Sequence, residues 1–222
     1  MSLSISLQLE ASGYPGLNDL IRKSGISRSL INKRPDKHMT LAIITVPLED
    51  VLYDLKAYIR KDKEGHRKIL AIGKLLHDPD NLTRRDIDLI EGVMESYFDS
   101  ITSLFAIKEI KPIVDELGGI ELKFSDLDLW ESGHFVAVFH DDDDYGWDDI
   151  VKLTRRFLRR MFPTGKLRLR EDEIVPHLTL AKYDVDRRKE LKKKLKQPDW
   201  NVHDYRIIEK RWRIYSSVRF YH

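Results

Sequence analysis

The first part of the chain alternates between strand-like and helix-like patterns. Residues 4–10 alternate apolar and polar side chains, which is typical of a strand with one buried face. A turn rich in glycine and proline then precedes a predicted helix at residues 17–23. Residues 37–46 are rich in β-branched side chains, which predicts a second strand. Apolar residues at helical spacing predict a helix over 48–60.

The rest of the chain continues this mixture of strands and helices. Residues 61–81 are charged and show no clear period, so no element is assigned there, whereas 84–105 has helical spacing. After a Gly-Gly break at 118–119, two strands at 120–130 and 134–140 are predicted to form a hairpin. The remaining predicted elements are a helix over 148–162, a strand over 175–183, a basic helix over 186–196 and a pair of closing strands within 205–221.

Strands and helices are mixed along the whole chain, and no shift in composition marks a linker. This pattern predicts one α+β domain over residues 1–222, which could be built from two similar halves. The repeated motif described below is the reason for considering two halves.

Composition excludes several classes of protein. With 222 residues and 41% hydrophobic content the chain can bury a core, yet no apolar stretch approaches the roughly 20 residues of a membrane helix. The absence of cysteine excludes disulfides, thiolate nucleophiles and cysteine-ligated metals. A net charge of +2 gives no overall field that favours nonspecific DNA binding. Since the N-terminus lacks the pattern of a signal peptide, we expect an intracellular protein without membrane association.

One short motif occurs twice. The pentapeptide HMTLA at residues 38–42 recurs as HLTLA at residues 177–181. From the composition of the chain, about 0.03 His-x-Thr-Leu matches are expected by chance. Both copies fall on predicted strands, so the repetition indicates a paired site.

The spacing within the motif has a geometric meaning on a strand. Each histidine and the threonine two residues later project from the same face, about 6–7 Å apart. Strict alternation also places Ala42 and Ala181 on that face, where their small side chains would leave space beside the polar pair. The intervening residues, such as Met39 and Leu178, would point into a core.

Two imidazoles and two hydroxyl groups suit phosphodiester chemistry. One neutral histidine can take a proton from the attacking oxygen, while the other, protonated, gives one to the leaving oxygen. Threonine hydroxyls can hydrogen-bond the non-bridging oxygens, where charge accumulates. We therefore predict a catalytic set without a metal or another cofactor, composed of His38, Thr40, His177 and Thr179. Which histidine is the base stays open, and a satisfied histidine–threonine pair in the core is the alternative for each copy.

The paired motifs resemble those of the 2H phosphoesterase superfamily, which includes LigT-type RNA ligases and cyclic phosphodiesterases, plant cyclic phosphodiesterases and viral 2′,5′-phosphodiesterases. The resemblance is closest to the central domain of A-kinase anchoring proteins, a nucleotide-binding, RNA-ligase-like branch. It covers nearly the whole chain, through residues 37–41, 47–51, 120–140, 176–182 and 215–218. No segment resembles a kinase-anchoring helix, so the resemblance concerns the phosphoester domain alone.

The resemblance implies a bilobal, pseudo-twofold α+β fold in which two antiparallel sheets form a cleft, with one motif per lobe and helices outside. The long stretch between the motifs agrees with a helical insertion at about 61–110. The implied activity is that of a monomeric phosphodiesterase acting on short RNA or nucleotides, either 2′,5′-linked, such as 2′,5′-oligoadenylate, or 2′,3′-cyclic phosphates. A sensor of AMP-like nucleotides with little turnover and a 3′-end-trimming RNA exonuclease are the alternatives.

Four further side chains are predicted to bind substrate. Trp130 and His134 flank the hairpin turn, and Tyr183 shares the expected face of the second motif, so each of the three could stack on a nucleobase. Arg168 precedes the second motif and could flank the cleft. Ordinary packing is the alternative for the aromatic residues.

Three charged segments fit more than one interpretation. The aspartates at 141–144 and 148–149 could suggest a Mg²⁺ or Ca²⁺ site, yet they lack EF-hand spacing, and acids at a helix N-terminus explain them better. Arginine pairs at 155–156 and 159–160, and seven basic residues within 187–196, could guide an oligonucleotide backbone. Solvated helix faces are the alternative for both basic segments.

Overall fold

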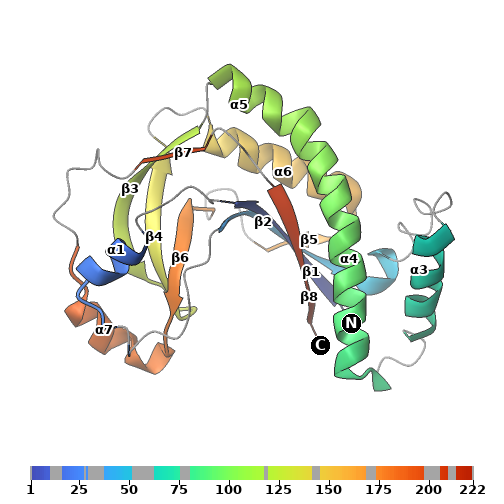
Figure 1. Cartoon of the computed structure of the whole chain (residues 1–222), viewed down its shortest axis with the longest axis horizontal. Helices are drawn as coiled ribbons and strands as arrows, with labels where there is room; N and C mark the ends of the chain where they lie inside the picture. Colours follow the sequence, from blue (N-terminus) through green and yellow to red (C-terminus); the bar gives the residue numbers. More distant parts are fainter. Residues whose placement is uncertain are drawn as a thin grey trace.

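Two four-stranded antiparallel sheets form the frame of the molecule, which we describe from a computed structural model (Figure 1). Sheet A contains, in the order in which its strands lie side by side, β5 (Lys166–Leu167), β2 (His38–Pro47), β1 (Ser2–Glu10) and β8 (Ile214–Tyr221). Sheet B contains β6 (His177–Lys182), β4 (His134–Asp141), β3 (Ile120–Leu129) and β7 (Arg206–Glu209). The first and last strands of the chain are therefore neighbours in sheet A.

The structure describes most of the chain. The described residues are 2–10, 17–27, 29, 38–51, 63–75, 81–117, 120–141, 146–168, 174–197, 206–209 and 214–221. Both copies of the repeated motif lie within these ranges, one in each sheet.

Helices pack along both sheets (Figure 1). On sheet A, α4 (Arg84–Phe105) contacts β8 and α6 (Trp147–Met161) contacts β2. On sheet B, α1 (Leu17–Lys23) contacts β6 and α7 (Arg188–Lys194) contacts β3. The remaining helical elements are α3 (Lys63–Leu75), which contacts α4, the π-helical turn η4 (Ala106–Ile110), α5 (Lys111–Leu117) and the 3-10 turn η6 (Val185–Arg187).

The long helix α4 begins at a capping box. The hydroxyl of Thr83 accepts a hydrogen bond from the backbone N–H of Asp86, whose carboxylate in turn accepts one from the N–H of Thr83. Helical structure then continues through η4 into α5, so the helical stretch between β2 and β3 extends to Leu117. The helix packs on α6 through Phe105, whose ring stacks on that of Phe157 with centroids 4.2 Å apart.

Most predicted elements are confirmed, and the chain is an α+β protein. The predicted helix limits at 17–23 and 84–105 match α1 and α4, and the predicted hairpin is β3–β4. Helix α3 was not predicted from the periodicity, because its many charged residues obscure the helical period, although it lies within the helical insertion that the resemblance implied at about 61–110. Of the helix predicted at 48–60, the described residues 48–51 are helical and the rest lie outside the described residues, as does the break at 118–119.

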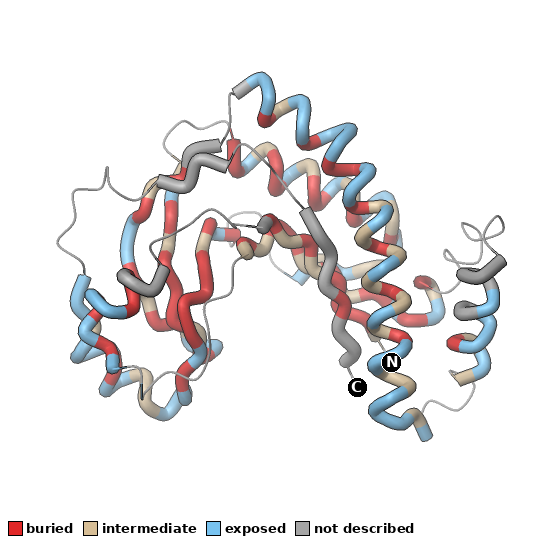
Figure 2. The backbone as a smooth tube through the Cα atoms, viewed as in Figure 1, coloured by how far each residue is buried: buried red, intermediate tan, exposed pale blue. Residues whose placement is uncertain are grey.

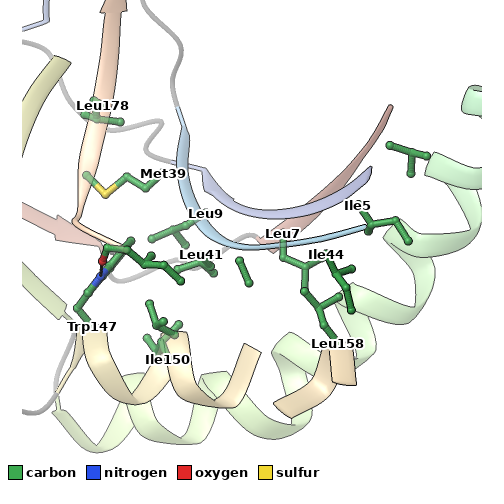
Figure 3. Close-up of a cluster of buried hydrophobic side chains, with 14 of the residues drawn as sticks. Ile5, Leu7, Leu9, Met39, Leu41, Ile44, Trp147, Ile150, Leu158 and Leu178 are labelled. Atoms are coloured by element: carbon green, nitrogen blue, oxygen red, sulfur yellow. Dashed lines mark hydrogen bonds between the residues drawn. The ribbon is translucent and has the colours of Figure 1, made fainter. Parts of the chain in front are cut away.

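Buried side chains from both sheets form one continuous hydrophobic cluster, part of which Figure 3 shows. Figure 2 marks the buried residues along the backbone. The core faces of β1 and β2 meet α6 there, with Leu41 beside Trp147 and Ile150. Met39 of β2 and Leu178 of β6 lie next to one another in the same cluster, and both are almost completely buried. The two motif strands are therefore held together through the residues between their histidines and threonines.

None of the described helices combines the length and the apolar character needed to cross a bilayer. The longest, α4, has alternating buried and exposed sides along its length (Figure 2).

Candidate active site

Both copies of the motif contain a β-bulge at the same position. In sheet A, Thr40 pairs with Gln8 and Ala42 pairs with Leu7, so Leu41 is an extra residue in β2. In sheet B, β4 pairs with Thr179 and then with Ala181, so the equivalent leucine of β6 is extra in the same way. The two pentapeptides therefore share a backbone irregularity as well as a sequence.

The bulges change which side chains accompany the histidines. Because one residue is inserted, Ala42 and Ala181 move to the core face, where both are fully buried. The prediction that these alanines lie beside the polar pair is therefore wrong. Strict alternation holds only from histidine to threonine, and it shifts by one residue afterwards.

On sheet A the face that carries His38 and Thr40 is polar. Residues directly opposed across β2 and β1 share a face, and three such pairs lie on this one: Thr40 with Gln8, Ile43 with Ser6, and Thr45 with Ser4. The amide of Gln8 donates to the hydroxyl of Ser6 at 3.2 Å. Small hydroxyl and amide side chains therefore accompany the first motif.

On sheet B the face that carries the second motif holds a different set of side chains. Its directly opposed pairs across β6 and β4 are His177 with Val138, Thr179 with Val136, and Lys182 with His134. The opposite face of β4, with Phe135, Ala137 and Phe139, is buried in the core. Thr179 is also buried, with 8% of its surface exposed, whereas His38, Thr40 and His177 are half-buried.

The hydrogen bonds of His177 fix the position of its proton. Its Nδ1 lies 2.8 Å from the carbonyl oxygen of Val175, and a carbonyl oxygen can only accept. In the neutral ring Nδ1 therefore carries the proton, and Nε2 is left with a free lone pair. His177 is thus prepared to accept a proton at Nε2.

The pKa of His177 is lowered from the ordinary histidine value. Burial is the main cause, because it disfavours the charged imidazolium, and positive charge on His134 and on His38 lowers the pKa further. The hydrogen bond to Val175 opposes these effects in part. The effect of His38 is the smallest of these, and it acts from sheet A on a histidine of sheet B.

Trp130 covers one side of His177. The two rings lie with their centroids 4.3 Å apart at an angle of 54°. The hairpin turn holds Trp130 there through two backbone hydrogen bonds. The N–H of Trp130 donates to the carbonyl oxygen of His134, and the carbonyl oxygen of Trp130 accepts from the N–H of Gly133. Gly133 has a φ of +78° and a Cβ at this position would lie 2.9 Å from the carbonyl oxygen of Tyr183, so the turn requires glycine.

Removing the indole of Trp130 is expected to raise the pKa of His177 toward its ordinary value. Trp130→Ala would let water reach the imidazole and reduce the burial that disfavours its charged form. An NMR titration of the His177 ring protons measures this change directly, and Trp130→Phe should give a smaller one. A lower pKa in Trp130→Ala would instead mean that the indole mainly stabilises the imidazolium through a cation–π contact.

Tyr183 does not lie where the sequence predicted. The bulge in β6 shifts the alternation, so Tyr183 is buried with 5% of its surface exposed, and its hydroxyl donates to the carbonyl of Trp130. The expectation that it shares the face of His177 and Thr179 is therefore wrong. It supports the turn that holds Trp130, and Lys182 takes the position on the motif face.

Arg168 lies beside sheet A, some distance from the first motif. Its Nε donates to the hydroxyl of Thr45 at 2.8 Å, and its backbone N–H donates to Ile43. Thr45 is on the motif face, about 13 Å along the strand from Thr40. Arg168 can therefore reach a part of a ligand remote from the histidines, but not the group between them.

His134 lies close enough to His177 to influence its charge. It begins β4, directly opposite Lys182, and its Nδ1 is 2.9 Å from the hydroxyl of Ser132. The position of His134 on the motif face agrees with its selection from the sequence. Lys182 was missed, because without the bulge it falls on the core side of the strand.

The described part of the aspartate-rich segment caps a helix. The backbone N–H groups of Gly146 and Trp147, at the start of α6, donate to the carboxylate of Asp141 at 3.0 and 2.8 Å. Asp148 and Asp149 lie in the first turn of this helix, where its dipole favours acids. Residues 142–144 lie outside the described residues, and no group of three potential metal ligands occurs among the residues that are described.

Loss of the Asp141 carboxylate is expected to destabilise the protein without affecting the motif residues. Asp141→Ala leaves two N–H groups of α6 without their acceptor, which should cost about 1 kcal/mol. For a chain of this size that corresponds to a fall in Tm of about 2–4 °C. Thermal unfolding measures it, with Asp148→Ala as the control in which no capping hydrogen bond is lost; equal falls in both variants would contradict the capping role.

The basic helices are less available for a polyanion than their sequences suggest. On α6, Arg155 is buried, which leaves Arg156, Arg159 and Arg160 exposed. On and before α7, Arg187 and Lys194 are both paired with Glu190, and the guanidinium of Arg188 contacts Glu131 and the carbonyl of Leu129. These contacts favour a structural role for part of each basic segment.

Comparison of the chain with protein-family models, with curated proteins and with solved structures gave no match. The strongest functional feature is therefore the pair of motifs itself. It consists of two bulged strands in contact, each with an imidazole and a threonine on the same face.

Proposed function

We propose that this protein is a metal-independent phosphodiesterase of the 2H phosphoesterase type. The substrate would be a short 2′,5′-linked oligoribonucleotide or a 2′,3′-cyclic phosphate. The single observation that supports this most is geometric: the two His-x-Thr-Leu-Ala strands contact each other, one in each sheet, and each has the same bulge. Two unrelated core histidines would have no reason to share both features.

The fold that this proposal implies is bilobal with a pseudo-twofold axis between the lobes. Each sheet contributes one motif, each motif has an extra leucine, and the two motif strands contact each other. Helices α3, α4 and α5 would then be the insertion between the lobes, since they lie between β2 and β3 in the chain.

The proposed division of labour makes His177 the base and His38 the acid. His177 has a lowered pKa and a free lone pair on Nε2, so it is mostly neutral near pH 7. Because positive charge on His38 disfavours protonation of His177, the singly protonated pair would hold its proton on His38. That state has one base and one acid ready together.

On a 2′,5′-linked substrate the reaction would be a transesterification. Nε2 of His177 removes the proton of the neighbouring 3′-hydroxyl, whose oxygen attacks phosphorus. The bond from phosphorus to the 5′-oxygen breaks, and His38 gives that oxygen a proton, which leaves a 2′,3′-cyclic phosphate and a free 5′-hydroxyl. With a cyclic phosphate as substrate, water would take the place of the attacking hydroxyl.

The threonine hydroxyls would stabilise the charge that develops on the non-bridging oxygens. Thr40 and Thr179 share the faces of His38 and His177, two residues along each strand. Because Thr179 is buried, a hydrogen bond that it donates would be little weakened by competing water. These four side chains can perform proton transfer and charge stabilisation without a Lewis acid.

The test is turnover of 2′,5′-linked oligoadenylate and of 2′,3′-cyclic AMP in excess EDTA. We expect activity to be unchanged by the chelator, because none of the proposed steps uses a metal. Loss of activity in EDTA that Mg²⁺ or Mn²⁺ restores would contradict the mechanism. Tight binding of AMP without turnover of either substrate would replace the enzyme by a nucleotide sensor.

A further inference from the structure

The motif face of sheet B extends beyond the second histidine and threonine. Val136 of β4 lies directly opposite Thr179. Two positions along the same strand, His134 lies directly opposite Lys182. This pair is about 7 Å from Thr179 along the strands, since two strand residues span that distance. That separation is comparable with the spacing of successive phosphates in an extended oligonucleotide.

Both side chains of this pair can donate hydrogen bonds to an anion. Lys182 is exposed and carries an ammonium group with three donors. Nδ1 of His134 is 2.9 Å from the hydroxyl of Ser132, and in the tautomer in which this hydroxyl donates to Nδ1, the proton of the neutral ring is on Nε2. His134 can therefore donate through Nε2, whereas Nε2 of His177 can only accept in the neutral ring.

The acidic residues around the pair restrict the direction in which a bound polyanion could extend. The two acidic residues nearest to it in the chain are engaged elsewhere: Glu131 with Arg188, and Asp184 with a backbone N–H of η6. On the far strand of the same face, Asp126 and Asp128 lie opposite Val138 and Val136. Burial and the charge of Asp128 raise the pKa of Asp126, and the two neighbouring carboxylates disfavour a phosphate on this side of the face.

We propose that His134 and Lys182 form a second phosphate-binding subsite, which holds the phosphate next to the one placed between His38 and His177. The proposal rests on the proposed function and narrows its substrate class. A substrate with a second phosphate one nucleotide away would be preferred over a substrate with a single phosphate. Its phosphodiester backbone would run past Thr179 toward the β3–β4 turn and away from the aspartates of β3.

Equilibrium binding of adenosine 2′,5′-bisphosphate and of AMP to the full chain tests the subsite without requiring turnover. We expect the wild-type protein to bind the bisphosphate about tenfold more tightly than AMP, as charge-assisted hydrogen bonds at a partly exposed site would give. In Lys182→Ala and in His134→Ala the ratio of the two affinities should fall to within about twofold. Lys192→Ala, which removes the same charge from an exposed position on α7, should leave the ratio unchanged.

The outcomes separate the subsite from the catalytic proposal. If the ratio of the bisphosphate affinity to the AMP affinity is the same in the wild type and in all three variants, the subsite is overturned. Turnover that depends on His38 and His177 would still support the enzyme in that case. A bisphosphate preference that requires Lys182 and His134, in a protein that turns over no substrate, would keep the subsite and overturn the catalytic function. If the affinity ratio falls as much in Lys192→Ala as in Lys182→Ala, the net charge of the protein explains the preference, and the subsite is contradicted.

Discussion

Alanine at either motif histidine is expected to remove most of the proposed phosphodiesterase activity. His177→Ala removes the proposed base and His38→Ala the proposed acid, and each should lower kcat by about 10²–10⁴-fold, the usual contribution of general acid–base catalysis. Steady-state kinetics with 2′,5′-linked diadenosine monophosphate in EDTA measure the loss. His140→Ala, an exposed histidine at the other end of β4 from His134, is the control that should keep its activity.

The pH dependence of kcat/KM distinguishes the two roles. The wild-type protein should give a bell-shaped profile, whose limbs belong to the coupled pair of imidazoles. The residual activity of His177→Ala should lose the limb that rises with pH, because that limb reports deprotonation of the base. A wild-type profile with a single limb would leave one motif without a catalytic role.

The same lowered pKa predicts how His177→Ala affects folding. Because the pKa of His177 is lower in the folded protein than its ordinary value of 6.5, the unfolded chain binds more protons as the pH falls through that value. Wild-type stability should therefore decrease on acidification from about pH 7.5, and part of that decrease should be absent from His177→Ala. Denaturant unfolding of the wild type and of His177→Ala, at about pH 7.5 and at a pH below 6.5, measures this difference in stability. The same experiment shows whether the inactive variant is folded.

The shared face of each histidine and its threonine could be predicted from the sequence because their signal is short in range. From histidine to threonine the alternation of a strand is regular, so the shared face follows from spacing alone. The repetition of five residues then links two segments that are far apart in the chain. Nothing in that inference needed the tertiary structure.

The residues after the threonine could not be assigned to the correct face. A bulge at Leu180 leaves no mark in the local pattern of apolar residues, because the leucine and the following alanine are both compatible with a buried strand. One inserted residue exchanges the roles of Tyr183 and Lys182, so the error affected every position beyond it. The same limit applies to Trp130, whose contact with His177 depends on the register of the hairpin against β6.

Replacing either motif threonine by valine is expected to lower kcat by about 10²–10³-fold, taking the loss of one oxyanion-hole donor as the nearest analogue. Valine keeps the shape of threonine and removes only the hydroxyl, so Thr40→Val and Thr179→Val test the hydrogen bond to the phosphoryl oxygen. The loss should be the same across the pH range, because a hydroxyl does not titrate there, and KM should change much less than kcat. Steady-state kinetics at several pH values separate this pattern from that of the histidine variants.

Thr154→Val provides a matched control for the threonine variants. Among the described residues, the buried hydroxyl of Thr154 on α6 has no hydrogen-bond partner, so its removal should leave the activity unchanged and the protein as stable as before or more so. If Thr179→Val also kept full activity, its hydroxyl would not contact the substrate in the transition state. The second motif would then supply a base alone, and stabilisation of the developing charge would have to come from Thr40 and from His38 in its protonated form.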